Sequence, residues 1–335
     1  MTIAEIAARA GVSKTAVSRY LNDGYVSAEK REAIRVVIEQ TGYVPSRQAQ
    51  LLRTGRSRLV GVILPTITSE SMGRVVHGIS HALASSDFQM LLANTENDEK
   101  KELEYLEVFR KGRVDGILLV ATMITPAHRR AIQSCQVPVV VLGQYSAKSC
   151  CIYHDDEGAA RALTEKMLAA GRRHIAYIGV TPRDRAAGLA RRTGVQAALT
   201  AAGVPWMEEL ALQSDFSMQG GATACNKLLA KGLDFDGLFC ATDSIAVGAM
   251  QALQAAGRSV PDDVAVVGVG DSKLGQLLHP RLTTAHYYHE KCGEEGSRML
   301  LSMMEGEPAT IQRLCLGYEL IDGETVPERI RGGNV

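Results

Sequence analysis

The first twenty residues show two stretches of helical hydrophobic spacing separated by a short break. Apolar residues of the first stretch recur at intervals of three and four, at Ile3, Ile6, Ala7 and Ala10. Gly11-Val12-Ser13 then interrupts the pattern, and Val17 and Leu21 mark a second helix. Gly11 can adopt the positive φ that a tight turn requires, and Ser13 is placed to cap the second helix. The pattern predicts helix, tight turn and helix over residues 2–22.

A third amphipathic helix opens at residues 26–31. Ser27 is placed as its cap, and Ile34, Val37 and Ile38 form its apolar stripe. Val12 can fill the small space between the first two helices. Three short helices of this kind make a compact headpiece.

Beyond residue 58, short apolar runs alternate with amphipathic stretches. Such runs are typical of buried parallel strands, and the stretches between them of covering helices. The first half has predicted strands at 59–64, 88–93, 114–120 and 137–142 and helices at 70–86, 99–111 and 126–134. After residue 149 the pattern restarts, with strands at 150–153, 174–179, 210–213, 237–243 and 264–269 and helices at 155–171, 186–202, 222–229 and 243–256. This alternation predicts an α/β body of two doubly wound parallel-sheet halves.

Charge is unevenly divided although the whole chain is neutral. Residues 1–58 hold ten Lys or Arg against five Asp or Glu, so this segment carries +5 and the remainder −5. The outer side of the second helix carries Lys14, Thr15, Ser18, Arg19 and Asn22. These are donors that reach base edges and phosphates when a helix lies in the major groove. A helical hairpin with a solvated charged face is the alternative interpretation.

Other site classes find little support in the sequence. We expect no secretory signal, because the N-terminus is polar and helical, and no apolar run approaches the length of about 18–20 residues that spans a bilayer. Seven cysteines without a Cys-x-x-Cys pair are interpreted as small buried residues in a reducing cytoplasm. The eight histidines have no metal-ligand spacing, so we expect neither metal nor cofactor.

The headpiece carries four matching strings, namely Thr2-Ile3-x-x-Ile6-Ala7, Ala10-Gly11-Val12-Ser13, Val17-Ser18-Arg19-x-Leu21-Asn22 and Gly42-Tyr43-x-Pro45-x-x-x-Ala49. With them the chain resembles the lac repressor (LacI/GalR) family of bacterial transcription regulators through nearly its whole length. The resemblance implies a helix-turn-helix domain over 1–58 with a hinge helix at about 47–53. The implied DNA-binding residues are Thr2, Ser13, Lys14, Thr15, Ser18, Arg19, Asn22, Tyr25, Ser46, Arg47, Ala49 and the minor-groove wedge Leu52.

Residues 59–335 then form a periplasmic-binding-protein-like domain for effector binding and dimerisation. Its first half is expected at about 59–145 and 286–306, and its second half at about 150–275 and 310–325, with residues 316–322 in the second half. The ligand of this family sits between the halves, at the carboxyl ends of the strands. The chain stops soon after residues 326–331 without a leucine heptad tail, which favours a homodimer over a tail-built tetramer.

The loops after the strands carry the candidate effector residues. They are Thr66, Thr68, Ser71, Asp156, Arg191, Phe216, Thr242, Asp243, Asp271 and Tyr287. The resemblance assigns Arg191 as the gripping arginine and Phe216 as the stacking ring. Carboxylates, a guanidinium fork and an aromatic face suit a sugar. Each residue also has a structural interpretation, with Asp156 and Asp243 as helix caps, Phe216 in the core, Arg191 in a surface ion pair and Tyr287 in interdomain packing.

Within the family, the Tyr153–Ala159 run, Gly188-x-x-Arg191-Arg192, Cys240–Asp243 and Leu277–Pro280 look most like the trehalose-operon repressor branch, which senses trehalose 6-phosphate. A phosphate needs concentrated positive charge or a helix N-terminus. Arg74, Arg183, Arg185 and Arg191 can supply charge, but Thr66 and Thr68 stand where a basic residue is wanted. A free disaccharide such as sucrose or trehalose therefore stays open.

The resulting hypothesis is a cytoplasmic repressor of a sugar-utilisation operon. A sugar or sugar phosphate bound between the halves would release it from near-palindromic operator DNA. A corepressor-dependent regulator that senses a purine is the alternative. A transport binding protein would not carry the basic headpiece, and no phosphate-binding glycine loop or catalytic triad order indicates an enzyme.

Overall fold

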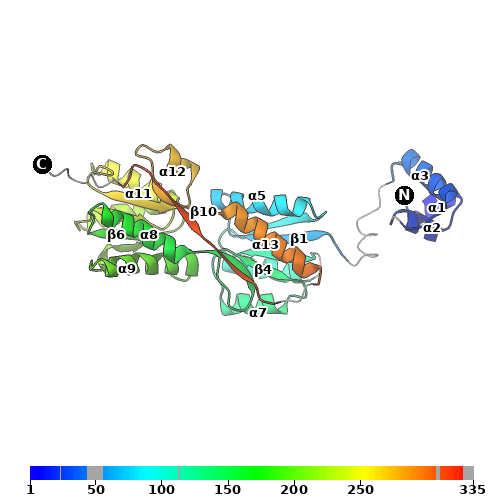
Figure 1. Ribbon diagram of the computed structural model, residues 1–335, viewed down its shortest axis with the longest axis horizontal. Helices are drawn as coiled ribbons and strands as arrows, with labels where there is room; N and C mark the ends of the chain where they lie inside the picture. The colour runs from blue at the N-terminus through cyan, green and yellow to red at the C-terminus, as the bar shows by residue number, and fades with distance from the viewer. Residues whose placement is uncertain (23, 44–55, 112–113, 307–309, 327–335) are drawn as a thin grey trace. The chain divides into compact units, whose positions relative to one another are not determined.

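The computed structural model describes residues 1–22, 24–43, 56–111, 114–306 and 310–326. The chain divides into two compact units, Met1–Ser57 and Arg58–Val335. Figure 1 shows the helices of the small unit and the two sheets of the large one. None of the helices in these ranges is long and apolar enough to cross a membrane.

The small unit contains the three predicted helices. They are α1 (Ile3–Ala10), α2 (Lys14–Tyr20) and α3 (Ala28–Thr41). Thr2 and Glu5 form a reciprocal capping box at the start of α1, and Gly11 ends that helix with φ of 64°, in the left-handed region that favours glycine. Ser13 accepts a hydrogen bond from the Ala16 N–H at 3.1 Å, as predicted for a cap. Ser27 occupies the N-cap position of α3, but its side chain makes no capping hydrogen bond.

The core of this unit is small, and all three helices pack around it. Its buried residues are Ile6, Ala7, Val17, Ile34 and Val37, with Val12 and Ile38 packed partly buried against them. The apolar stripes read from the sequence therefore meet as expected.

The first lobe of the large unit is a six-stranded sheet with helices on both faces. Its strand order is β11-β5-β4-β3-β1-β2, with parallel pairing throughout. The strands are β1 (Leu59–Leu64), β2 (Gln89–Asn94), β3 (Gly116–Val120), β4 (Val139–Leu142), β5 (Cys150–His154) and β11 (Arg313–Leu316). Helices α5 (Glu70–Ala84) and α13 (His289–Met304) cover one face, and α6 (Glu99–Arg110) and α7 (Pro126–Ser134) the other.

The second lobe repeats this three-layer plan. Its strand order is β12-β10-β9-β8-β6-β7, and only β12 runs antiparallel to its neighbour among the described pairs. The strands are β6 (Ile175–Gly179), β7 (Ala211–Gln213), β8 (Gly237–Cys240), β9 (Ala265–Val269), β10 (Thr283–Tyr287) and β12 (Tyr318–Ile321). Helices α8 (Asp156–Ala169) and α9 (Arg191–Ala201) pack on one face, and α10 (Met218–Ala230) and α11 (Asp243–Ala255) on the other.

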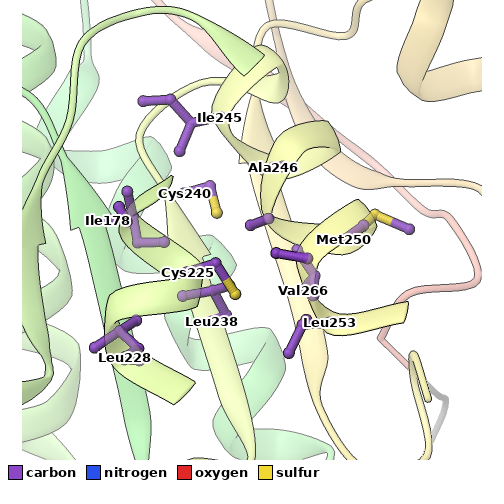
Figure 2. Close-up of a cluster of buried hydrophobic side chains, with 14 of the residues drawn as sticks. Ile178, Cys225, Leu228, Leu238, Cys240, Ile245, Ala246, Met250, Leu253 and Val266 are labelled. Carbon is purple, nitrogen blue, oxygen red and sulfur yellow. The ribbon is translucent and has the colours of Figure 1, made fainter. Parts of the chain in front are cut away.

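Strand residues alternate between the two cores of each lobe. In the second lobe, Ile178 and Val266 face α10 and α11, whereas Tyr177 and Val267 face α8 and α9. Figure 2 shows the first of these cores, where Leu228 and Ile245 from the helices meet Leu238 of β8. Burial on both faces explains why the strands read as continuous apolar runs.

Two strands lie in a different lobe from the one expected. Residues 150–153 were expected to begin the second half, but β5 pairs with β4 and completes the first sheet. Residues 310–316 were also assigned to the second half, yet β11 pairs with β5, and only β12 joins the second sheet. The physical reason is that an apolar run shows burial but not which distant strand it pairs with.

The cysteines follow the predicted pattern with two exceptions. Five are buried free thiols, whereas Cys135 is half-buried and Cys315 is exposed on β11. Because β11 is an edge strand of the first sheet, its residues are less covered than those of the central strands.

A buried carboxyl and a buried imidazole meet between α6 and α7. Glu102 is 4% exposed and His128 is fully buried, and their Oε1 and Nε2 atoms lie 3.7 Å apart. Neither of these two atoms has a hydrogen-bond partner among the described residues. Burial, together with the nearby charge of Glu99, raises the pKa of Glu102 from 4.5 to about 8, and burial lowers the pKa of His128.

We predict that Glu102→Gln removes a pH dependence of stability. The folded chain holds the Glu102 proton more tightly than the unfolded chain, so the stability it contributes below pH 4.5 is lost as pH rises to about 8. The loss approaches about 1.4 kcal/mol per pH unit over that window. Urea unfolding of the large unit from pH 5 to 9 measures it, with exposed Glu104→Gln on the same helix as control. Equal slopes for wild type and both variants would contradict the prediction.

Candidate functional site

The exposed side of α2 presents the predicted DNA-binding side chains. Lys14, Thr15 and Arg19 are exposed, and Ser18 is half-buried on the same helix. Lys14 and Ser18 lie four residues apart, as do Thr15 and Arg19, so each pair shares a helix face. Thr2, Ser13, Asn22 and Tyr25 are also exposed, with Tyr25 at 87%.

The basic residues of α2 differ from Arg35 of α3 in their partners. Within the described part of the chain, Lys14 and Arg19 have no carboxylate partner, whereas Arg35 of α3 pairs with both Glu32 and Glu39. An unpaired cation is available to a phosphate without the loss of an existing ion pair. Ser46, Arg47, Ala49, Leu52 and the expected hinge helix lie outside the described residues.

Arg191 is the centre of a buried polar cluster in the second lobe. It is 8% exposed, its Nε donates a hydrogen bond to Asp156 Oδ1 at 2.8 Å, and its Nη2 lies 2.7 Å from the same oxygen. Another hydrogen bond joins Nη1 to the carbonyl of Ala241. Burial alone would lower the pKa of Arg191, but Asp156 and Tyr287 hold it above its usual value, so the guanidinium stays charged.

The approach of two helices brings this ion pair together. Arg191 begins α9 after a π-helical turn at Arg185–Ala190, and Asp156 lies in the first turn of α8. A Cβ at Gly194 would collide with the carbonyl of Glu157, so glycine permits α8 and α9 to pack closely. The Arg-x-x-Gly spacing thus has a packing reason as well as a chemical one.

Tyr287 joins the cluster from β10. Its hydroxyl donates to Asp156 Oδ1 at 3.0 Å, and its ring lies 5.2 Å from the Arg191 guanidinium. His154 of β5 stacks on this ring, with centroids 4.7 Å apart. Burial lowers the pKa of His154 to about 4, so the imidazole is neutral at pH 7. Residues of both lobes therefore meet where β5 and β10 end.

Asp243 and Asp271 are held by a second network. Asp243 is buried and accepts from the Ser272 N–H and the Thr284 hydroxyl, both at 2.6 Å. Burial raises the pKa of Asp243. Asp271 lies 2.9 Å from His286 Nδ1 and accepts from Gln276 at 2.8 Å.

The structural alternatives for these residues can now be decided. The caps of α8 and α11 are Asp155 and Thr242, so neither Asp156 nor Asp243 is the capping residue. Arg191 is not a surface partner, because its ion pair with Asp156 is buried. Phe216 is not core, because it is 41% exposed. Tyr287, in contrast, does pack between the lobes, as its contact with His154 shows.

The remaining first-lobe candidates line the loop after β1. The hydroxyls of Thr66 and Thr68 lie 2.8 Å apart, and Ser71 bonds Ser69 at the start of α5. A surface hollow beside Phe216 is lined by residues such as Ser214, Asp215 and Lys227 and contains none of the predicted effector residues. Because its lining lies wholly within the second lobe, we do not place the effector there.

Contacts between the lobes involve Arg74 and Arg183, which the sequence offered as positive charges for a phosphate, and four partners that it did not single out. Arg74 of α5 pairs with Glu70 at 2.6 Å and donates to the carbonyls of Asp271 and Gly270, at 2.7 and 3.3 Å. At two further points Arg183 pairs with Glu99 at 2.7 Å and Gln144 donates to Asp184 at 2.8 Å. Glu70 and Glu99 begin predicted helices, and Gln144 and Asp184 lie just outside predicted elements, but only tertiary structure shows their partners.

The arrangement can hold a polyhydroxylated ligand. Asp156, Asp243 and Asp271 supply acceptors, Arg191 supplies donors, and Phe216 offers an exposed ring for C–H faces. No group of three or more His, Cys, Asp or Glu in the described ranges could hold a metal ion.

Comparisons with known proteins show that the chain is similar to bacterial transcription regulators. Residues 2–46 match the family model described as "Bacterial regulatory proteins, lacI family", and residues 164–326 match "Periplasmic binding protein-like domain". The chain is 33% identical over 328 residues to the HTH-type transcriptional regulator GntR of Escherichia coli (strain K12), covering 96% of this chain and 97% of that protein.

Two further similarities extend over nearly the whole chain. The sucrose operon repressor of Staphylococcus xylosus is 31% identical, covering 95% of this chain and 98% of that protein. A solved complex of the transcriptional regulator CelR with cellobiose is 30% identical with a TM-score of 0.75, covering 97% and 99% of the two chains. The expected headpiece and two-lobed α/β body are confirmed.

We predict that Asp156→Asn strongly destabilises the large unit. Removing one charge of a buried pair leaves Arg191 uncompensated, at a cost of about 3–5 kcal/mol. Glu165→Gln is the matched control, because Glu165 lies on the same helix and its ion pair with Arg161 is exposed, worth roughly 0–1 kcal/mol. Urea denaturation at pH 7 measures both, and equal losses would show that the Asp156 pair contributes no more than a surface one.

Proposed function

The chain belongs to the lacI family of bacterial regulatory proteins, and on this basis we propose that it is a transcriptional repressor of a sugar-utilisation operon. In this proposal it binds operator DNA in the cytoplasm as a homodimer. A small sugar between the lobes of the large unit releases it. It carries out no catalysis.

The proposal for DNA binding is carried by the unpaired cations of α2. Lys14 and Arg19 are exposed and without carboxylate partners in the described ranges, on a segment with a net charge of +5. Lysine and arginine so placed contact phosphates and guanine edges in the major groove. Two headpieces of a dimer would read half-sites separated by about one helical turn.

The proposal for the effector rests on the cluster around Arg191. Its guanidinium has five N–H groups, more than its contacts with Asp156 and the Ala241 carbonyl occupy, and it is therefore suited to grip a ligand oxygen. The carboxylates nearby accept hydroxyl protons. A sugar ligand is consistent with the name of one relative, the sucrose operon repressor, and with the solved complex of CelR with cellobiose.

The two activities would be coupled through the contacts between the lobes. A ligand that changes the contacts of Arg74, Arg183 and Gln144 would move the first lobe relative to the second. A coupling free energy of about 1–3 kcal/mol between the ligand and DNA sites is typical of such proteins. In this proposal the coupling is negative: ligand binding weakens the binding of operator DNA.

The deciding experiment is fluorescence anisotropy of the full chain on DNA from its own upstream region. It is titrated at fixed salt with trehalose 6-phosphate, trehalose, sucrose and a purine base. Release by one sugar supports the proposal and identifies the effector. Tighter binding with the purine would favour corepression, and DNA binding that none of them alters would refute the proposed effector class.

We predict that Lys14→Ala and Arg19→Ala each weaken operator binding by about 1–3 kcal/mol. The loss of a phosphate contact also lowers the slope of log affinity against log salt by about one, whereas the loss of a base contact relaxes sequence preference. Arg35→Ala is the control, because Arg35 is already paired with Glu32 and Glu39. Unchanged affinity in both α2 variants would refute the DNA-binding assignment.

We predict that Phe216→Ala raises the sugar concentration needed for release by about fivefold while operator affinity stays the same, because an aromatic face contributes about 1 kcal/mol. The exposure of Phe216 allows the change without a cost to folding. Met218→Ala is a matched control, since Met218 is similarly exposed at the start of α10. Anisotropy titration with the releasing sugar measures the midpoint, and identical midpoints would remove Phe216 from the site.

A further inference from the structure

We propose that the interlobe site takes an unphosphorylated polyhydroxyl compound and rejects a phosphate group. This inference rests on the proposed function, because it names the chemical class of the same effector. It is argued from the partners of each arginine, from the occupants of the helix N-termini and from the neutral histidines.

Carboxylates already pair with three of the four arginines that could bind a phosphate. Arg74 is held by Glu70, Arg183 by Glu99 and Arg191 by Asp156, at 2.6 to 2.7 Å. A phosphate dianion at any of them must displace or closely approach a carboxylate, which repels it. Arg185 is exposed, and a single exposed cation interacts weakly with an anion in salt solution.

The chain's own side chains occupy most helix N-termini of the large unit, which are the other common phosphate sites. The N-cap residues of α5 and α13 make no capping bond, but each of these helices carries a glutamate in its first turn, Glu70 and Glu290, which repels an anion. Asp98 accepts from the Lys100 N–H, Asp155 from Gly158, and Asp184 from Ala186 and Ala187. At α12 (Lys273–Leu277), the first N–H is already used, because it donates to the Glu70 carboxylate at 3.1 Å. Hydroxyls of Thr125, Ser217 and Thr242 cap α7, α10 and α11. A phosphate would compete with these groups.

The histidines near the cluster add no compensating charge. Burial lowers the pKa of His154 to about 4 and that of His289 well below its usual value, so both are neutral at pH 7. His286 is already paired with Asp271. Among the charged side chains of this cluster, carboxylates therefore predominate. Carboxylates arranged in this way accept hydroxyl protons, and the guanidinium fork of Arg191 suits two neighbouring oxygens of a polyol.

The test uses inorganic phosphate as the probe and the full chain at constant ionic strength. Equilibrium dialysis with radiolabelled phosphate at pH 7.5 compares wild type with Glu70→Gln/Glu99→Gln, which frees Arg74 and Arg183. Both glutamates lie toward the surface, so the double variant should fold, and circular dichroism confirms that it does. Glu165→Gln is the control, because it frees the surface residue Arg161 away from the interlobe contacts.

We expect no saturable binding to wild type or to Glu165→Gln, and an affinity for phosphate at least about tenfold higher in the double variant, as expected from the removal of about 1.4 kcal/mol of repulsion. Saturable binding to wild type overturns the inference. Absence of binding to the double variant also overturns it, because the carboxylates would then not be the cause of rejection.

A second measurement separates this inference from the proposed function. Anisotropy with operator DNA compares trehalose with trehalose 6-phosphate and sucrose with sucrose 6-phosphate. Release by either phosphorylated member overturns the inference while leaving the repressor function intact. Failure to bind DNA at all, with phosphate dialysis as expected, would overturn the repressor function and leave the charge argument standing.

Discussion

The large unit depends on the burial of one charge pair. Asp156 and Arg191 come from helices on the same face of the second sheet, and Tyr287 reaches them from the strand that leads back to the first lobe. Taking both charges out of water is costly, and further bonds offset this cost: the Tyr287 hydroxyl donates to Asp156, and Arg191 donates to the Ala241 carbonyl. A site built this way is stiff, and it is linked to both lobes by the contact between Tyr287 and His154.

Acidic side chains have a double use in this protein. Asp98, Asp155 and Asp184 satisfy backbone N–H groups at helix starts, while Asp156 and Asp243 sit one residue after a cap and turn inward. The same short segment thus supplies one carboxylate to the fold and another to the site. One residue caps the helix, and the next places a carboxylate at the end of the preceding strand. Negative charge can therefore gather at the strand ends without loss of helix stability, although the whole chain is neutral.

Much of the architecture could be predicted from hydrophobic periodicity. Buried strands such as β1 and β9 are short apolar runs bounded by turn residues, and the headpiece stripes at Ile6, Val17 and Ile34 meet as their spacing indicates. The lobe of β5 and β11 was predicted wrongly, because local patterns do not contain long-range pairing.

The candidate site was predictable in part for a similar reason. Residue type and position after a strand single out Arg191 and Asp271, but no sequence signal shows that Arg74 donates to the Asp271 carbonyl across 197 residues of chain, or that His154 stacks on Tyr287. Partners that depend on side-chain direction require the folded molecule.

The position of β11 has a consequence for how the chain acquires its structure during synthesis. This strand is an edge of the first sheet, and α13 covers one face of the same sheet, yet both emerge after every strand of the second sheet except β12. A nascent chain that has completed residue 288 therefore holds an unfinished first lobe with apolar surface uncovered. Neither lobe corresponds to one continuous gene segment, so an early stop codon or a simple subcloning of the first half yields an incomplete core rather than a smaller domain.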